Sequence, residues 1–264
     1  MSSRLYHFSG AGNNFIVLDG REAEIDREVA RIQALCAQYH TDGLMILGCE
    51  DGYDFRMEFY NPDGSGGMMC GNGGRCITAF ADELGIHPAD GKRFHFLAPD
   101  GPHTAEILEK NEQGWIIRLQ MKDVEGVKAV LGGYFLDTGT RHFVQFVPDT
   151  EAVDIEQEGP RYRWDPAFAP QGANANFVER RPGGGLRVRT FEKGVEGETL
   201  ACGTGITASA IAAWFDATES AIGSPVHTPV RARQDDLAVD FTPLGHDRFT
   251  GVFLTGPATI QAIY

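Results

Sequence analysis

Residues 70–81 read CGNGGRCITAFA, and residues 202–213 read CGTGITASAIAA. Each stretch is a cysteine, then Gly-x-Gly, then a run of small and apolar residues that has the length of a helix. In both cases strand-like segments and a polar, glycine-containing loop come before the cysteine, and further strand-like segments follow. This repetition predicts an internal duplication, with one copy of the motif in each of two domains.

The segment that follows the second cysteine restricts the architecture further. Between residues 203 and 215 it has no charged residue, and a helix that lacks a polar face must be buried on all sides. A β-sheet curled around one central helix would bury it in this way. We therefore expect a sheet wrapped around a helix in each half, with the break between the two domains near residues 121–126.

Two other segments have clear hydrophobic periodicity. Residues 26–40 have apolar side chains three or four positions apart, which predicts a helix. Its buried face is expected to contain Val29, Ile32, Cys36 and Tyr39. Residues 54–60 alternate instead with a period of two, which predicts a strand. The side chains expected to face the core there are Phe55, Met57 and Phe59.

Shorter apolar runs bounded by turn residues predict the other strands. Those of the first half are LYHF, FIVLDG, GLMILGCE, RFHFLA, HTAEILE and GWIIRLQM. Those of the second half are GGYFLDTG, HFVQFV, NFVERR, LRVRTFE, LAVDFTP, RFTGVFL and ATIQAIY. Both halves are therefore expected to consist mainly of strands.

The composition excludes several classes of function. The 264 residues, 42% of them apolar, are enough to bury a sizeable core. The net charge of −14 argues against a nucleic-acid partner, because phosphate binding needs clustered Lys and Arg. The first residues, MSSRLYHFSGAGNNF, lack the apolar region of a secretory signal. No run approaches the roughly 18 apolar residues of a membrane helix, so we expect a cytoplasmic protein with no membrane partner.

The cysteines indicate thiol chemistry rather than disulfides or metal binding. There are five of them, an odd number, which is typical of a reducing compartment. No CxxC pair or Cys/His cluster has the spacing of a zinc site, so no metal is expected. Outside the two motif positions, structural roles are expected for Cys36, Cys49 and Cys76.

A cysteine at the start of a helix has a distinctive environment. If helices open at Gly71 and Gly203, then Cys70 and Cys202 lie beside unpaired backbone N–H groups that carry partial positive charge. Such a position lowers the pKa of a thiol and makes thiolate available near neutral pH. The glycines would also let a substrate carboxylate approach the same N–H groups.

Two equivalent thiols suit the inversion of a stereocentre. One takes a proton from one face of the carbon and the other delivers a proton to the opposite face, and their roles exchange in the reverse direction. The helix N-termini would stabilise the carbanion electrostatically without a cofactor. Two alternatives remain open on the motif alone: buried cysteines with a purely structural role, and a dithiol redox switch.

These motifs resemble those of the diaminopimelate epimerase family. The resemblance covers nearly the whole chain and rests on GAGNNF, YNPDGSGGMMCGNGGRC, GANANFVE and FEKGVEGETLACGTG. It implies an α/β (α+β) fold of two pseudo-symmetric domains, each a mostly antiparallel β-sheet rolled into a barrel around a central helix. In that fold the last strand returns to the first domain. The expected halves are then 1–122 with 255–264, which contains Cys70, and 123–254, which contains Cys202.

The resemblance also implies an activity. Members of the family interconvert LL- and meso-diaminopimelate in lysine biosynthesis, without a metal or a cofactor, in a cleft that closes on the substrate. The expected partner is therefore a small-molecule amino acid. Family members are commonly dimeric, so a homodimer is expected as well.

The family's functional residues transfer to matching positions of this sequence. Cys70 and Cys202 match the pair that exchanges the proton, and His142 and Glu192 match a pair that tunes the thiol pKa values, which a nearby charge would do. The remaining positions match substrate-binding residues, with Glu192 again among them. They are Asn13, Asn61, Gly71, Asn72, Thr140, Asn174, Glu192, Lys193, Gly203 and Thr204.

The sequence departs from the family pattern mainly where the far end of the substrate is expected to bind. Thr140 replaces an Asn, and Lys193 replaces an Arg, so that the charge is kept but the bidentate fork is lost. Asn14 replaces an Asp in the first motif. A racemase of the same fold that acts on another amino acid, such as histidine, is therefore the alternative enzyme, and a non-catalytic thiol sensor is the alternative outside enzymes.

Overall fold

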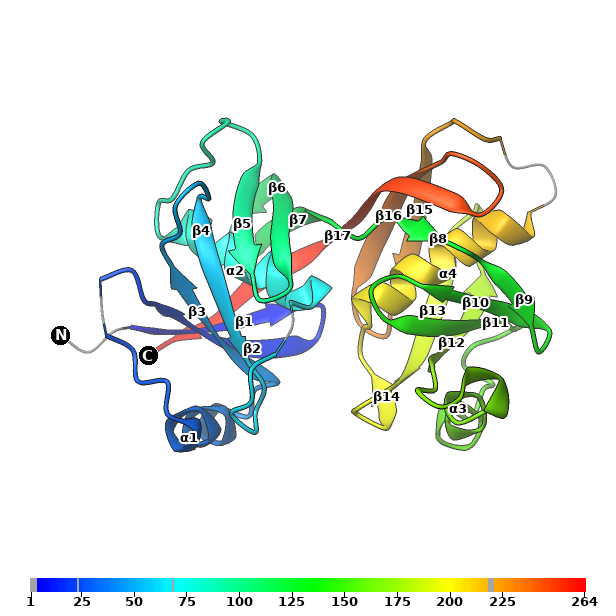
Figure 1. Cartoon of the computed structure of the whole chain (residues 1–264), viewed down its shortest axis with the longest axis horizontal. Coiled ribbons are helices and arrows are strands. Elements are labelled where there is room, and N and C mark those ends of the chain that lie inside the picture. Colours follow the sequence, from blue (N-terminus) through cyan, green and yellow to red (C-terminus); the bar gives the residue numbers. More distant parts are fainter. Residues whose placement is uncertain (1–3, 23, 68, 218–220) are drawn as a thin grey trace. The chain divides into compact units, whose positions relative to one another are not determined.

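The computed structural model describes residues 4–22, 24–67, 69–217 and 221–264, and its cartoon is shown in Figure 1. The chain folds into two units. Unit 1 is Met1–Leu119 with Gly256–Tyr264, and unit 2 is Gln120–Thr255. The expected halves, 1–122 with 255–264 and 123–254, have boundaries within a few residues of those of the two units.

Unit 1 is a closed ring of strands (Figure 1). Within its described part, eight strands pair in chain order, and the last pairs with both β7 and β1. They are β1 (Leu5–Gly10), β2 (Asn13–Asp19), β3 (Gly43–Gly48), β4 (Phe55–Tyr60), β5 (Phe94–Ala98), β6 (Gly101–Asn111), β7 (Gly114–Gln120) and β17 (Arg248–Ile263). Closure leaves no strand of the ring with an unpaired edge.

Helix α2 (Gly71–Glu83) lies inside this ring. Its residues 71–81 are all buried, and the rings of Tyr6 and Phe8 on β1 contact Phe80 of the helix at centroid distances of 4.9 and 6.0 Å. Side chains alternate across a strand, so the neighbours of these two residues on β1 point away from α2. The helix that begins at Gly71 is therefore the centre of the core of unit 1.

Helix α1 (Val29–Tyr39) covers the opposite side of the barrel wall. It buries Ile32, Leu35 and Cys36 against Leu5, Ile16 and other outward-facing apolar residues of β1 to β3. The expected burial of Cys36 is confirmed. The expected burial of Val29 is wrong, because this side chain at the first position of the helix is 50% exposed.

Unit 2 repeats the order of unit 1. The N-terminal parts of the two units both contain an antiparallel hairpin, then a parallel pair connected through a helix, then a second antiparallel pair. The elements of unit 2 are β8 (Val124–Glu125), β9 (Lys128–Val130), β10 (Gly133–Asp137), β11 (Arg141–Phe146), α3 (Ile155–Arg163), β12 (Asn174–Arg180), β13 (Leu186–Glu192), β14 (Gly197–Thr199), α4 (Gly203–Asp216), β15 (Val226–Arg231) and β16 (Asp236–Pro243). The predicted duplication is confirmed.

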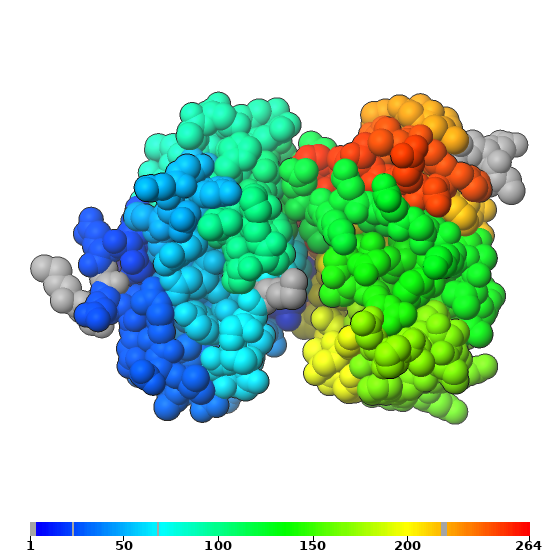
Figure 2. All heavy atoms as spheres, in the orientation of Figure 1, coloured from blue at the N-terminus to red at the C-terminus, as the bar shows by residue number. Residues whose placement is uncertain are grey.

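Helix α4 occupies in unit 2 the place of α2 in unit 1. It contacts β10, β11, β12, β13, β15 and β16, and its residues 205–213 are buried. In the space-filling view, green atoms from the residues that follow β8 form the middle of the visible face of unit 2, and yellow-green and yellow atoms form its lower part (Figure 2). The uncharged helix is thus buried by a sheet that curls around it, as its composition predicts.

Two elements differ from the expectations. Helix α3 was not expected, because Gly159 and Pro160 lie inside it and its composition is polar; an Asp154 N-cap and an acidic first turn stabilise its start. The segments RFTGVFL and ATIQAIY, expected as two strands, form the single strand β17, which pairs with β16 in unit 2 and with β1 in unit 1. Of the helices in the described residues, none is long and apolar enough to cross a bilayer.

Candidate active site

Cys70 caps the N-terminus of α2. Its backbone is extended, its sulfur accepts a hydrogen bond from the N–H of Gly73 at 3.2 Å, and its carbonyl accepts from the N–H of Gly74 at 2.8 Å. The sulfur therefore lies against the partly positive end of the helix, where a thiolate is stabilised. The structure thus gives Cys70 the position that the sequence predicts.

A directed chain of amide hydrogen bonds adjoins Cys70. Arg75, which is fully buried, donates to the Oδ1 atom of Asn72 at 2.9 Å. Asn72 donates in turn to the Oδ1 atom of Asn13, and Asn13 donates to a carboxylate oxygen of Asp42 at 3.2 Å. The chain fixes which way each amide points, since a carboxylate and an arginine end it. Asn13 and Asn72, both expected to bind substrate, are therefore joined directly by a hydrogen bond.

Asn61 lies in the loop between β4 and α2. Its amide donates to the Ser65 hydroxyl at 3.0 Å, and its backbone N–H donates to the Ser65 carbonyl at 2.9 Å. These bonds close the loop that leads to Cys70. In the structure the side chain therefore acts in turn formation.

Cys202 occupies the equivalent place at the start of α4. It is 7% exposed, and its carbonyl accepts from the N–H of Ile206 at 2.8 Å, as that of Cys70 does from Gly74. Its sulfur lies 3.5 Å from the hydroxyl oxygen of Thr204. The two cysteines therefore have equivalent N-cap positions in the repeated fold, although only the Cys70 side chain accepts a capping hydrogen bond from its own helix.

His142 lies on β11 beside this helix N-terminus. Its Nε2 atom is 2.9 Å from the hydroxyl oxygens of both Thr140 and Thr204, and its Nδ1 atom is 3.0 Å from the amide nitrogen of Asn176. Burial lowers the pKa of His142 to about 3, although the nearby carboxylate of Asp137 opposes the shift. The imidazole is therefore uncharged near neutral pH, so any influence on Cys202 acts through hydrogen bonds rather than through charge.

The buried, neutral His142 predicts a pH dependence of stability. Its folded-state pKa lies below the unfolded value of about 6.5, so as the pH falls the unfolded chain takes up the proton first. The stabilisation is complete above pH 6.5 and is lost as the pH falls toward 3. Between about pH 7.5 and about pH 5, His142 accounts for a loss of about 2 kcal/mol in the free energy of unfolding.

Urea denaturation at the two pH values measures this loss. The variant His142→Gln is expected to lose about 2 kcal/mol less than the parent protein over the same interval. His87→Gln removes an exposed histidine of unit 1 and is the matched control, expected to behave like the parent. Equal losses in all three proteins would show that His142 is not buried in its neutral form.

Asn174, Lys193 and Glu192 lie at the ends of neighbouring strands. The amide of Asn174 donates to the carbonyl of Arg141 at 2.9 Å and accepts from the backbone N–H of Lys193 at 2.7 Å. Glu192 accepts from the hydroxyl of Thr199 at 2.8 Å, across the β13–β14 hairpin. Asn174 thus connects β11, β12 and the end of β13, and the Lys193 side chain is exposed.

The structure sorts the predicted residues into two groups, one in each unit. Unit 1 brings Asn13, Gly71 and Asn72 to Cys70. Unit 2 brings a larger group to Cys202, with Glu192 and Lys193 at its border; the group is Thr140, His142, Asn174, Gly203 and Thr204. Four residues of these two groups were not expected from the sequence: Asp42, Arg75, Asn176 and Thr190. Of these, Asn176 could have been found, because Asn174 and Asn176 have the spacing of side chains on one face of a strand.

The other cysteines are separate from both helix caps. Burial raises the pKa of Cys76 to about 12 and also raises that of Cys36, so both remain thiols. Cys49 is exposed just after β3. The structural role expected for these three agrees with the burial of Cys36 and Cys76, whereas Cys49 is exposed.

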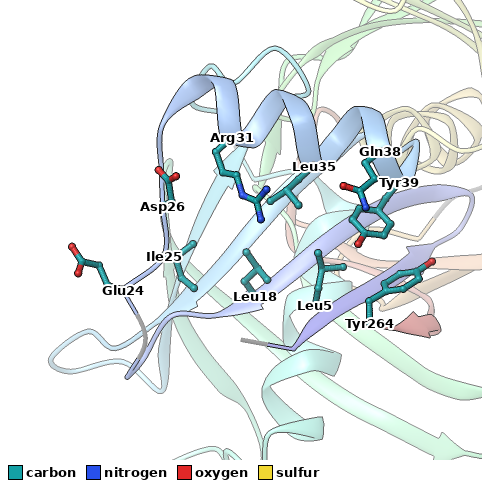
Figure 3. A pocket seen from close by; sticks show the side chains of 10 residues that line it. All are labelled: Leu5, Leu18, Glu24, Ile25, Asp26, Arg31, Leu35, Gln38, Tyr39 and Tyr264. Carbon is teal, nitrogen blue, oxygen red and sulfur yellow. The ribbon is translucent and has the colours of Figure 1, made fainter. Parts of the chain in front are cut away.

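A groove of about 390 Å³ lies on the outer side of the barrel wall of unit 1 (Figure 3). Apolar side chains of β1, β2 and α1 line it together with the polar Glu24, Asp26, Arg31 and Gln38, and the rings of Tyr39 and Tyr264 lie 4.7 Å apart at one end. Leu5 and Leu18, which line it, point away from α2. The groove is therefore separated from Cys70 by the sheet, and its lining includes none of the predicted site residues.

Comparison with known proteins identifies the family of this chain. The model of the diaminopimelate epimerase family matches residues 6–126 and 134–260, which include both cysteine motifs. The chain belongs to the diaminopimelate epimerase family. Diaminopimelate epimerases are isomerases, so this chain is an isomerase as well, and the expectation from its motifs is confirmed at this level.

Relatives in the diaminopimelate epimerase family match over almost their full length. The diaminopimelate epimerase of Flavobacterium psychrophilum is 40% identical over 259 residues, which are 97% of this chain and 96% of the relative. That of Chlorobaculum tepidum is 36% identical over 267 residues, with 97% of each chain covered. The family assignment therefore applies to both units.

Solved structures share the fold at low sequence identity. A phenazine biosynthesis protein of the PhzF family from Bacillus anthracis is 15% identical, with a TM-score of 0.76, and the match covers 100% of this chain and 99% of the other. A probable proline racemase from Agrobacterium radiobacter K84 is 14% identical, with a TM-score of 0.64 and coverage of 100% and 92%. This chain thus shares its fold with proteins that have different names and little sequence identity to it.

Proposed function

We propose that this chain interconverts LL- and meso-diaminopimelate by proton transfer at the α-carbon, in the biosynthesis of lysine. Cys70 and Cys202 are the two proton carriers. The observation that supports this most strongly is that both cysteines cap the N-terminus of a buried helix, at equivalent positions of the two units. At this position the partly positive end of a helix stabilises a thiolate, which a thiol needs in order to take a proton.

The reaction follows from thiol chemistry at a helix N-terminus. One cysteine, as thiolate, removes the α-proton and becomes a thiol, and the other, as thiol, gives its proton to the opposite face and becomes a thiolate. A carboxylate bound at the first N–H groups of a helix is stabilised there, and an α-carboxylate held in this way would stabilise the carbanion.

Lys193 is proposed to bind the distal carboxylate of the substrate. The loop that carries it, 193–197, is anchored by Glu196, whose carboxylate accepts from Arg163 at 3.0 and 3.2 Å and from the N–H of Gly194 at 3.1 Å. The Arg163 side chain is only 4% exposed, so the loop is joined to the buried part of unit 2. The Lys193 ammonium is a point charge on this loop.

This role predicts an effect of Lys193 on substrate affinity. Lys193→Gln is expected to raise the KM for diaminopimelate about tenfold with little change in kcat, because a charge-assisted contact to a non-reacting group is lost. Lys193→Arg keeps the charge and should stay close to the parent. Lys128→Gln, which neutralises another exposed lysine of unit 2, is the control. An unchanged KM in Lys193→Gln would remove Lys193 from the substrate site.

One observation favours a second candidate, a racemase of the same fold with a different amino acid as substrate. The Thr140 hydroxyl, expected to contact the distal end, lies within 3.1 Å of His142 and Thr204 and is engaged beside Cys202 instead. Together with Lys193 in place of a bidentate arginine, this leaves fewer groups to select a second amino-acid end.

Proton NMR in D₂O tests both candidates. The reduced protein is mixed with LL-diaminopimelate and, separately, with a panel of single L-amino acids that includes histidine. Loss of the α-proton signal with diaminopimelate only is the expected result. Exchange with another amino acid, and none with diaminopimelate, would support the second candidate. Exchange with neither would favour a non-catalytic thiol sensor.

A further inference from the structure

Asn176, on β12, is the centre of a buried polar cluster in unit 2. Its amide nitrogen donates to the carbonyl oxygen of Phe143 at 2.9 Å, and its amide oxygen accepts from the hydroxyl of Thr190 at 2.9 Å. The side chain is fully buried. Because a carbonyl oxygen can only accept a hydrogen bond, these two contacts determine which end of the amide is nitrogen.

The orientation of Asn176 determines the tautomer of His142. The amide nitrogen that donates to Phe143 also lies 3.0 Å from the Nδ1 atom of His142. A donor at this distance requires Nδ1 to accept, so Nδ1 carries no hydrogen. The neutral ring has one N–H group, which must then be at Nε2. The buried amide thus directs the N–H of His142 toward the start of α4.

The Nε2–H group determines the direction of the hydroxyls that it meets. The hydroxyl oxygens of Thr140 and Thr204 both lie 2.9 Å from Nε2 and 3.1 Å from each other. A hydroxyl has one hydrogen and two lone pairs. The Thr140 oxygen lies 3.5 Å from the amide nitrogen of Asn174, which can only donate, so the Thr140 hydrogen is left to point at Thr204. In this arrangement the Thr204 oxygen accepts from Nε2 and from Thr140. Its own hydrogen is then directed to the Cys202 sulfur, 3.5 Å away.

We propose that the Thr204 hydroxyl is a dedicated hydrogen-bond donor to the sulfur of Cys202, and that Asn176 is the positioning residue that sets this direction through His142. A donor aimed at the sulfur stabilises the thiolate over the thiol. With the opposite tautomer, Nε2 would accept a hydroxyl hydrogen and would compete with the sulfur for that of Thr204. The Thr204 hydroxyl therefore donates to the sulfur, and the Thr140 hydroxyl supports this direction, in addition to any contact that either makes with substrate.

The sulfur of the equivalent cysteine of unit 1 has a different hydrogen-bond donor. The Cys70 sulfur accepts from a backbone N–H, that of Gly73 at 3.2 Å. A substitution in the Asn176–His142–Thr204 chain is thus expected to affect Cys202 and to leave Cys70 unchanged. Cys70 provides an internal reference in every variant. The inference rests on the proposed role of Cys202, but the readouts below need no turnover.

The first test measures alkylation of the two cysteines by iodoacetamide at neutral pH, with each rate followed by mass spectrometry of its peptide. Thr204→Val removes the hydroxyl at constant shape and should lower the ratio of the Cys202 rate to the Cys70 rate by about three- to tenfold. The thiolate fraction falls, and the greater nucleophilicity of the remaining thiolate offsets this only in part. Thr204→Ser keeps the hydroxyl and should retain the parent ratio.

The second test asks whether Asn176 acts through Thr204. Asn176→Leu should lower the same ratio, and Asn176→Leu combined with Thr204→Val should lower it no further than Thr204→Val does, because the two residues belong to one chain. Additive losses would contradict the proposal. If Asn176→Leu instead partly unfolds unit 2, Cys202 becomes more accessible and its alkylation rate rises, which is the opposite change. The NMR measurement on the wild-type protein, described below, then tests the proposal.

The third test reads the tautomer directly in the unmodified protein. Nitrogen NMR of protein labelled at histidine should show His142 with hydrogen on Nε2 and none on Nδ1, with His142→Gln used to assign the signal. A ring protonated at Nδ1 would overturn the proposal. If the alkylation and NMR results are as expected but diaminopimelate is not turned over, the hydrogen-bond chain stands and the proposed function fails. If diaminopimelate is turned over normally but Thr204→Val leaves the alkylation ratio unchanged, the proposed function stands and the hydrogen-bond chain fails.

Discussion

Cys70→Ala and Cys202→Ala are each expected to reduce the epimerisation of diaminopimelate by about 10³-fold or more, because each removes the proton carrier of one face. The remaining cysteine still reaches the other face. In D₂O, one variant should therefore exchange the α-hydrogen of the L centre without inverting it. The other variant should do the same only at the D centre of meso-diaminopimelate. Proton NMR measures the exchange, and a chiral separation measures the inversion.

This crossed pattern separates the two-base mechanism from its alternatives. A single base that serves both faces would leave one variant fully inactive and the other nearly unchanged. Two purely structural cysteines would lower inversion and exchange together, in proportion to the amount of folded protein. Cys49→Ser, which alters an exposed cysteine outside both helix caps, is the matched control and should keep full activity.

Gly205→Ala is expected to destabilise the protein by about 2–4 kcal/mol, the sum of overpacking and a disrupted buried hydrogen bond. A Cβ atom at this position would lie 2.3 Å from the Oδ1 atom of Asn176, and 3.3 Å from both His142 and Thr190. Asn176 cannot move aside at low cost, because its amide is bonded on three sides. Urea denaturation measures the change in the free energy of unfolding.

The repeat supplies a matched control for this substitution. Gly73 follows Cys70 at the same spacing at which Gly205 follows Cys202, but a Cβ atom there would come no closer than 3.3 Å to Cys70, with Met45 and Met57 next. Gly73→Ala gains about 0.5–1 kcal/mol of helix propensity, so its net effect on stability should be small. Equal losses in the two variants would show that packing against Asn176 is not the cause.

Much of the fold could be predicted because it depends on local patterns. The motif helix of each unit was expected from its apolar composition, and the strand β4 from its alternation, and both are present. Helix α3 was missed because Gly159 and Pro160 disfavour a helix locally, while packing against β12 and β13 stabilises it. Val29 was expected to be buried because it has the spacing of the buried face. Periodicity does not show that the first turn of a helix extends beyond the sheet on which the helix packs.

The candidate site also has features that the sequence determines and features that only the tertiary structure decides. The sequence by itself determined the duplicated thiols, their place at helix N-termini and the family, since residue types at short spacings carry these features. Only the tertiary structure decided that Asn176 holds His142 and that Thr204 meets both His142 and Cys202. These contacts depend on the parallel register of β11 and β12, in which His142 pairs with Asn174 and Val144 with Asn176. A register between strands separated by α3 is set by packing, and the direction of each hydrogen bond depends on partners distant in the chain.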